Sequence, residues 1–509
     1  MKIATLFAHF FLFVFPITAQ ITFQKVVGGL HEGCASAVQQ SSDGGYIFAG
    51  YIGQFPRKNF LMKADSVGDT LWTKTYLDTV YNLTHAMQQT FDGGYILAGS
   101  GNLSSNIYLI KTDSNGDTVW TRSFNNISYD AEAYSVCETS DSGYMISGTF
   151  LGDIFLIKTN SNGDTLWTKG YGGWLTEYGR SIKQTNDGGY IIAGATESFG
   201  AGLTDFYLVK TDMNGNLEWS KTYGDVHYEF AISVQQTTDG GYIIGGYAGS
   251  AGINILKTDS AGTMEWSHDY VVGTESIAFS IVQTNDQGYI VTGSCTGTDG
   301  YTDVFLLKIN DLGFNVWTKI YDEGDYYIPF PDPNSVWQTN DSGYIVTGFK
   351  FRFGSDTTGI YFIKTTSDGN SNCNQSNLQT LSNGWNIQEN TAATIVSPTN
   401  FSVGIPAMVI GHLDSFISLC EPLGINEYSI NQGDFFISPN PVSGTCTIHN
   451  THKLQNVQVE IYNLLGEKKY AVKLNNELTT LNGELLAKGI YFVKLQLENG
   501  TTIQKLIIE

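Results

Sequence analysis

Seven copies of one short phrase, Asp-x-Gly-Tyr, predict that most of this 509-residue chain is an all-β repeat protein. The tyrosines of the copies are Tyr46, Tyr95, Tyr144, Tyr190, Tyr242, Tyr289 and Tyr344, which stand 46 to 55 residues apart. That period matches a four-stranded propeller blade. Each copy holds four short β patterns between turn residues, and no segment has helical apolar spacing. We therefore predict a seven-bladed β-propeller.

The N-terminal segment is expected to close this ring. A tryptophan marks the fourth β pattern in only six copies: Trp72, Trp120, Trp167, Trp219, Trp266 and Trp317. The last copy, residues 335–369, offers only three strands, and residues 22–29 align with residues 166–173. Pairing the N-terminal strand with the last blade would remove two unpaired edges. It would also place Phe23 where Trp167 stands in its own blade.

Two polar positions recur with the phrase. A lysine precedes the second turn of each copy, from Lys63 to Lys364, and we expect it to be paired or solvated. A glutamine such as Gln40 precedes the first turn, except that the third copy has Glu138. We expect these groups to tie inner strands to one another or to channel water.

The repeat resembles the bacterial β-propeller repeat, in which a Gly-Gly segment leads through an inner strand and a turn into an aromatic-Ile-x-x-Gly strand. Here that strand reads Tyr46-Ile47-Phe48-Ala49-Gly50 in the first copy. The resemblance covers Ile21 to about Asn370. It implies the fold and no activity.

Export is expected from the first residues of the chain. Residues 1–19 combine Lys2 with a short apolar run that ends at Ala19, as a secretory signal peptide does. No later stretch approaches eighteen apolar residues, so we expect no transmembrane segment. We expect the mature chain to begin at Gln20.

The net charge of −22 argues against nucleic acid or an anionic membrane as a partner. No cofactor motif is present, and we expect a monomer.

None of the six cysteines stands in a C-x-x-C pair. Cys373 and Cys420 bracket a polar stretch, residues 371–426, that we interpret as a linker or small β segment after the propeller of residues 20–370. A disulfide is expected between these two cysteines, and the other four are expected to be buried small residues.

The C-terminal residues 427–509 alternate as a small antiparallel β-sandwich does. They contain the phrase Ser438 to Pro441, with Pro439, Asn440 and Pro441, then Tyr462 to Gly466, Gly489-Ile490-Tyr491, and a basic last strand at Lys505. In this order the landmarks resemble the type A sorting domain of the type IX secretion system. The resemblance implies recognition by that translocon and a location outside the outer membrane of a Gram-negative bacterium, either secreted or at the cell surface.

Cation sites are not expected in the second turns. Asp113-Ser114-Asn115-Gly116-Asp117 places oxygens at alternate positions, as a calcium loop does. Other copies lose these oxygens, for example at Val67 and Ala261, while the glycine persists. This pattern is that of a turn, so we assign no metal site, and calcium stays an alternative only for the turns of the second, third and fourth copies.

The loops on one face vary in length and composition between copies. Both short recurring turns should lie on the opposite face. The variable loops place aromatic residues beside carboxylates, which could stack on sugar rings and accept hydroxyl hydrogen bonds. The candidate ligand-binding residues are Trp174, Glu177, Tyr178, Asp225, Tyr228, Glu229, Asp322, Asp325, Tyr326 and Tyr327.

No catalytic grouping can be assembled from the sequence. The histidines are scattered, and no phosphate loop or nucleophile motif is present. We therefore expect a non-enzymatic surface binding or adhesion protein for a glycan or protein. The alternatives are a polysaccharide hydrolase or lyase with carboxylates on the variable face, and a structural role in a surface layer.

Overall fold

The structure, a computed structural model, describes residues 20–508 except for short internal segments. The segments outside the description are 31–32, 54–56, 78–81, 102–105, 126–130, 249–251, 274, 298–299, 301, 322–334, 352–357, 373–374, 378–379, 385–387, 393–394, 398–401, 405–408, 412–416, 421–434, 439–444, 451–456, 464–467, 475–477, 483–485, 487 and 498–499. The chain divides into two compact units, Met1–Cys420 and Glu421–Glu509.

Every regular element of the described residues is a strand. Those of the repeats are β1 (Phe23–Leu30), β2 (Gly33–Gln40), β3 (Tyr46–Ile52), β4 (Lys58–Ala64), β5 (Thr70–Leu77), β6 (Asn82–Gln89), β7 (Tyr95–Gly101), β8 (Asn106–Thr112), β9 (Thr118–Asn125), β10 (Ala131–Glu138), β11 (Tyr144–Phe150), β12 (Asp153–Thr159), β13 (Thr165–Gly172), β14 (Glu177–Gln184), β15 (Tyr190–Thr196), β16 (Asp205–Thr211), β17 (Leu217–Gly224), β18 (Glu229–Gln236), β19 (Tyr242–Ala248), β20 (Gly252–Thr258), β21 (Met264–Val271), β22 (Ser276–Gln283), β23 (Tyr289–Thr296), β24 (Thr302–Ile309), β25 (Asn315–Tyr321), β26 (Ser335–Gln338), β27 (Tyr344–Phe351) and β28 (Thr358–Thr365).

Seven short strands follow them: β29 (Gln375–Asn377), β30 (Leu381–Gly384), β31 (Gln388–Thr391), β32 (Ile395–Ser397), β33 (Ser402–Gly404), β34 (Val409–Gly411) and β35 (Ile417–Cys420). The C-terminal unit has β36 (Phe435–Ser438), β37 (Thr445–Asn450), β38 (Val457–Asn463), β39 (Lys468–Leu474), β40 (Leu478–Asn482), β41 (Gly489–Leu497) and β42 (Gly500–Ile508).

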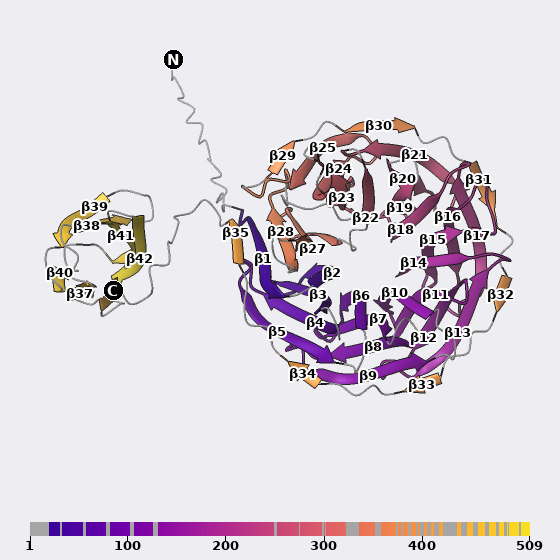
Figure 1. Ribbon diagram of the computed structural model, residues 1–509, viewed down its shortest axis with the longest axis horizontal. Coiled ribbons are helices and arrows are strands. Elements are labelled where there is room, and N and C mark those ends of the chain that lie inside the picture. The colour runs from indigo at the N-terminus through magenta and orange to yellow at the C-terminus, as the bar shows by residue number, and fades with distance from the viewer. Residues whose placement is uncertain are drawn as a thin grey trace, which may run out of the picture. The chain divides into compact units, whose positions relative to one another are not determined.

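The repeats form antiparallel four-stranded sheets that succeed one another as the blades of a propeller do (Figure 1). In the described residues, six sheets contain four consecutive strands each, from β2–β5 to β22–β25. A seventh contains β26, β27, β28 and the N-terminal strand β1. The predicted all-β repeat architecture is therefore present.

The N-terminal strand β1 pairs with β28 in the register that the alignment predicts. Phe23 stands opposite Lys364, as Trp167 stands opposite Lys158 and Trp72 opposite Lys63. Phe23 is fully buried and packs edge-on against Tyr46 of the first sheet at 5.9 Å between ring centroids. The strand thus contributes to a core shared by the last and first sheets.

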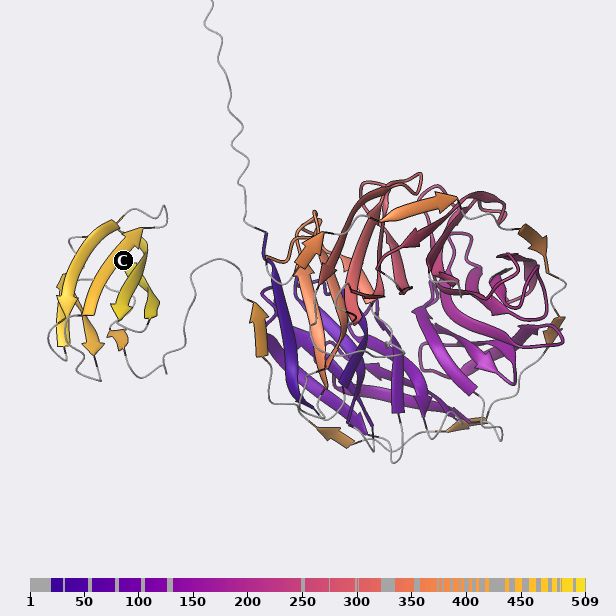
Figure 2. The same ribbon diagram turned by 45° about the horizontal axis from the view of Figure 1, so that its top comes forward.

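Residues 375–420, within the stretch interpreted as a linker or small β segment, form a belt of short strands along the sheets. Each belt strand, β29 to β35, adds a fifth strand to the outer edge of one sheet, as the orange arrows outside the ring in Figures 1 and 2 show. The belt passes the sheets in reverse chain order, from β25 back to β5, and its last strand β35 pairs with β1. The belt therefore belongs to the same compact unit as the repeats, Met1–Cys420.

The recurring Asp-x-Gly-Tyr phrase folds as a turn that is bonded to the recurring lysine. In the first copy the Asp43 carboxylate accepts hydrogen bonds from the Gly45 N–H at 3.1 Å and from Lys63 Nζ at 2.7 Å. The following Gly44 has a φ of 85°, which glycine adopts without strain. Burial alone would raise the pKa of Asp43, but the hydrogen bonds from Lys63 and Ser41 lower it to about 2. All seven lysines are buried and paired with the turn aspartate. Of the two predicted states, paired or solvated, the structure therefore shows the paired one.

The recurring glutamine links neighbouring sheets. Gln184 Oε1 accepts a hydrogen bond from Ser140 N at 2.8 Å, and Glu138 does the same for Phe91 N at 2.6 Å. Gln40 of the first sheet accepts from Asn340 N of the last at 2.7 Å. The prediction that these groups connect inner strands is therefore confirmed. The hydrogen bond between the last and first sheets is of the same kind as those between sheets that follow one another along the chain.

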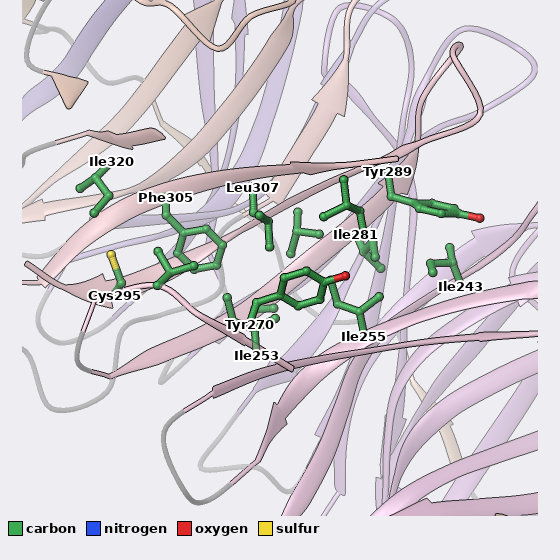
Figure 3. Close-up of a cluster of buried hydrophobic side chains, with 14 residues drawn as sticks. Ile243, Ile253, Ile255, Tyr270, Ile281, Tyr289, Cys295, Phe305, Leu307 and Ile320 are labelled. Carbon is green, nitrogen blue, oxygen red and sulfur yellow. The ribbon is translucent and has the colours of Figure 1, made fainter. Parts of the chain in front are cut away.

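The core lies between adjacent sheets and consists of aliphatic and aromatic side chains. Figure 3 shows one such layer, in which Ile253 and Tyr270 of one sheet face Ile281, Phe305 and Leu307 of the next. Each large apolar side chain that is fully buried contributes about 1.5–3 kcal/mol. Cys34, Cys137 and Cys295 are buried, as expected for three of the four remaining cysteines.

The C-terminal unit contains two antiparallel sheets, one of strands β36, β37 and β40, the other of β39, β38, β41 and β42. Buried apolar side chains on the larger sheet include Val459, Ile461, Val493 and Leu506. Within the described part of the chain, no helix is long and apolar enough to span a membrane.

Candidate functional site

The two faces of the repeats differ in the way that the sequence predicts. The lysine at the end of each third strand reaches the aspartate of the first turn, so both short turns lie on one face. The connections between sheets, and those from second to third strands, lie on the other face. Around the sheet of β14–β17 these connections are residues 173–176, 197–204 and 225–228.

Hydrogen bonds join these three loops. Leu175 N donates to Ser198 Oγ at 2.8 Å, and Glu197 N donates to the Thr176 carbonyl at 2.8 Å. On the other side, Leu203 N donates to the carbonyl of His227 at 3.2 Å. The loop 197–204 therefore connects the loops before β14 and before β18 into one ordered surface.

Apolar side chains cover this surface and are open to solvent. Trp174 is 91% exposed and Tyr228 is 50% exposed. The other exposed apolar side chains are Leu175, Leu203 and Val226. We call these five residues the loop patch. Exposed apolar groups gathered on ordered loops are typical of an interaction surface.

Glu177 lies beneath the loops, although the sequence placed it among the ligand-binding residues. Its side chain is fully buried and accepts hydrogen bonds from Gly173 N at 2.9 Å and from Thr196 Oγ1 at 2.8 Å. Both carboxylate oxygens therefore have donors, and the side chain holds the loop at residues 173–176 in place.

Glu229 occupies the corresponding position before the next sheet and is also fully buried. Neither of its carboxyl oxygens has a hydrogen-bond partner of good geometry within the described residues. Burial, with the facing carboxylates of Asp225 and Asp205, raises the pKa of Glu229 to about 8. The imidazole Nδ1 of His227 lies 2.6 Å from Asp225 Oδ1. Asp225, His227 and Glu229 each bring one ligand atom into a group whose members lie within 4.8 Å of one another.

Tyr178, another predicted residue, belongs to a row of aromatic rings on strands β14, β18 and β19. Its ring lies 5.7 Å from Phe230, which stacks on Tyr247 at 5.3 Å. Nearby, the Arg180 guanidinium lies 4.0 Å from the ring centre of Tyr134. Arg180, Phe230 and Tyr247 were not predicted as site residues, and they lie inside the regular strands β14, β18 and β19.

Several predicted residues lie outside the described residues. They are Asp322, Asp325, Tyr326 and Tyr327, the sorting residues Pro439, Asn440, Pro441 and Gly466, and Cys373. Gly489 and Tyr491 stand on β41. Lys505 stands on the neighbouring β42, opposite Phe492 of β41. Cys420 ends β35 opposite Gln24.

The sequence missed His227 and the aliphatic residues of the loop patch. His227 stands two residues from both Asp225 and Glu229, and this alternate spacing was the available signal. Leu175, Leu203 and Val226 carry no such signal in the sequence.

Three solved structures are similar to the chain at low identity. PorZ, an essential bacterial surface component of the type-IX secretion system of the human oral-microbiomic Porphyromonas gingivalis, is 10% identical over 92% of this chain and 58% of its own, with a TM-score of 0.38. Sqt1 from Chaetomium thermophilum is 11% identical over 66% of this chain and 99% of its own, with a TM-score of 0.38. A putative gluconolactonase is 9% identical over 60% of this chain and 92% of its own, with a TM-score of 0.34.

The chain thus spans 58% of the length of PorZ. TM-scores of this size assign neither a fold nor a function. No curated protein matches the chain.

The C-terminal residues have a family match. Residues 437–509 match the secretion system C-terminal sorting domain. This range contains Gly489, Tyr491 and Lys505, and it begins two residues before Pro439. The C-terminal unit is therefore the type IX sorting domain that the sequence resembles, and the protein is secreted or located at the cell surface.

Proposed function

We propose that this protein is a non-enzymatic binding or adhesion protein of the cell surface, which holds a glycan or a protein against the loop patch. The observation that carries the proposal is the exposure of Trp174, 91%, within loops that hydrogen bonds hold in place. An exposed indole on an ordered loop offers a large apolar contact area at a low cost in conformational entropy. The sorting domain delivers this surface to the outside of the cell.

We further propose that the seven sheets form a closed seven-bladed propeller. The hydrogen bond from Asn340 to Gln40 supports closure, because sequential neighbours use the same link. The core shared by Phe23, Phe48 and Phe362 supports it as well. The smaller unit completes the proposed architecture as a two-sheet sandwich.

A disulfide between Cys373 and Cys420 would turn the belt into a covalent loop around the sheets. Ser371 Oγ accepts a hydrogen bond from Gln24 Nε2 at 2.7 Å, and Cys420 stands opposite Gln24 in the strand pairing. The two ends of the belt therefore converge on the same residue of β1. Removal of residues 1–19 on export would leave Gln20 at the new terminus, where its side chain donates a hydrogen bond to the Asp341 carbonyl at 2.6 Å.

The test of the binding function compares two exposed aromatic sites. The purified full chain is applied to an array of bacterial cell-envelope polysaccharides and surface proteins. We expect the double variant Trp174→Ala/Tyr228→Ala to bind its array ligand at least about tenfold more weakly, since hot-spot aromatic residues carry most of an interface's energy.

The matched control is Phe91→Ala. Phe91 is also exposed but lies on a short turn of the opposite face, so its loss should leave binding unchanged. Binding that is equally strong in the double variant would contradict the assignment of the loop patch. The hydrolase or lyase alternative stays a prediction, and the burial of Glu177 and Glu229 does not favour it.

A further inference from the structure

The loops before β14 and before β18 have the same length, which allows a comparison position by position. Gly172 ends β13 and Glu177 begins β14, while Gly224 ends β17 and Glu229 begins β18, five residues apart in both cases. Beside each loop, the aspartate that begins a third strand lies near the same glycine as the glutamate does. Asp153 lies near Gly172, and Asp205 lies near Gly224. A Cβ on Gly224 would lie 2.1 Å from Asp205 Oδ1 and 2.8 Å from Glu229 Oε2.

The two loops differ in the groups that face the buried glutamate. Glu177 has the backbone N–H of Gly173 and the hydroxyl of Thr196 as donors. At the position of Thr196, the strand opposite Glu229 has Ala248, which has no hydroxyl to donate. At the positions of Gly173 and Leu175 stand Asp225 and His227. The second loop therefore lacks the hydroxyl donor of the first and gains a carboxylate and an imidazole near the glutamate.

No basic side chain balances this charge. Within the described residues, Asp205, Asp225 and Glu229 form no ion pair with a lysine or arginine, and the one pairing is that of Asp225 with the His227 ring. Asp205 accepts only backbone hydrogen bonds, from Ala201 N at 3.1 Å and Gly202 N at 3.2 Å. A fully buried carboxyl group without a partner is costly unless a proton or a cation compensates its charge.

We propose that Asp225, His227 and Glu229 bind one divalent first-row transition-metal ion, with Asp205 as a neighbouring carboxylate. Two carboxylates and one imidazole are a donor set that suits such an ion, whereas Ca²⁺ prefers oxygen ligands only. Donor atoms at about 2.0–2.2 Å from one ion stand at most about 4.4 Å apart. The observed spread, within 4.8 Å, exceeds that limit by no more than about 0.4 Å. The bound ion would hold in place the loop that carries Val226 and Tyr228.

The experiment uses the untagged full chain, stripped of metal with a chelator, and Zn²⁺ alone as the probe in calorimetric titration at neutral pH. We expect a Zn²⁺ site whose affinity falls at least about tenfold in Glu229→Gln and in His227→Ala, because each removes one of three ligands. Glu177→Gln is the matched control. It changes the corresponding glutamate of the neighbouring loop, whose partners are donors, and should leave the Zn²⁺ affinity unchanged.

A second measurement keeps the test valid if Glu229→Gln folds poorly. The His227 side chain is 53% exposed, so His227→Ala should fold normally. We expect Zn²⁺ to raise the melting temperature of the unaltered chain and of Glu177→Gln more than that of His227→Ala. The absence of Zn²⁺ binding to the unaltered chain would overturn the proposal and leave a shared proton as the compensating charge. Equal affinity in His227→Ala, or Ca²⁺ binding that is as tight as Zn²⁺ binding, would also overturn it.

Discussion

Deletion of residues 20–27 is expected to lower the free energy of unfolding by more than about 5 kcal/mol, although these residues lie outside every complete repeat. They supply the outer strand of the sheet of β26–β28, where Phe23 is fully buried and Val26 and Val27 are nearly so. The loss of Phe23 alone should cost about 3 kcal/mol. The deletion also leaves β28 and β35 with unpaired edges, so aggregation should increase. Chemical denaturation of both chains measures the change.

The control is the chain that begins at Gln20 and keeps β1. It should have the stability of the mature protein, because residues before Gln20 are expected to be removed on export. If the chain that begins at Gly28 unfolded at the same denaturant concentration as this control, the role of β1 in closure would be contradicted.

Truncation after residue 371 should destabilise the repeats by about 5 kcal/mol, because it removes the whole belt. Seven short pairings would be lost, each with net hydrogen-bond contributions of a little under 1 kcal/mol. The truncation also removes Glu389, which pairs with Lys221 at 2.5 Å, and Ala392, whose carbonyl accepts a hydrogen bond from Ser220. A melting temperature lowered by about 6 °C is the expected readout.

Truncation after Cys420 is the matched control for the belt. It removes the C-terminal unit and leaves Met1–Cys420 intact, so the melting temperature of the repeats should not change. Equal melting temperatures for the two truncated chains would show that the belt contributes nothing to stability.

The repeats were predictable in detail because seven copies of one pattern can be compared. The absence of a seventh tryptophan and the alignment of residues 22–29 with residues 166–173 predicted the pairing of β1 with β28, with Phe23 in the tryptophan position. The exposure of Trp174 was also predictable, since this residue stands in a loop of variable sequence.

The belt left no such pattern. Its strands have three or four residues each and pair through their backbones, so neither alternation nor a repeat marks them. The burial of Glu177 and Glu229 was missed for a different reason. A carboxylate beside aromatic residues in a loop indicates a surface site, and only the register to Gly172 and Gly224 places these side chains under the loops.

Closure of the ring by the N-terminal strand is the central claim, and Phe23→Ala tests it most directly. Phe23 contacts Tyr46 of the first sheet and Phe362 of the last, each at 5.9 Å between ring centroids. Equilibrium denaturation should show a loss of about 3 kcal/mol, since the substitution leaves a cavity where two sheets meet. The exposed Phe91→Ala should cost less than about 0.5 kcal/mol. A Phe23→Ala chain as stable as Phe91→Ala would contradict closure by this strand.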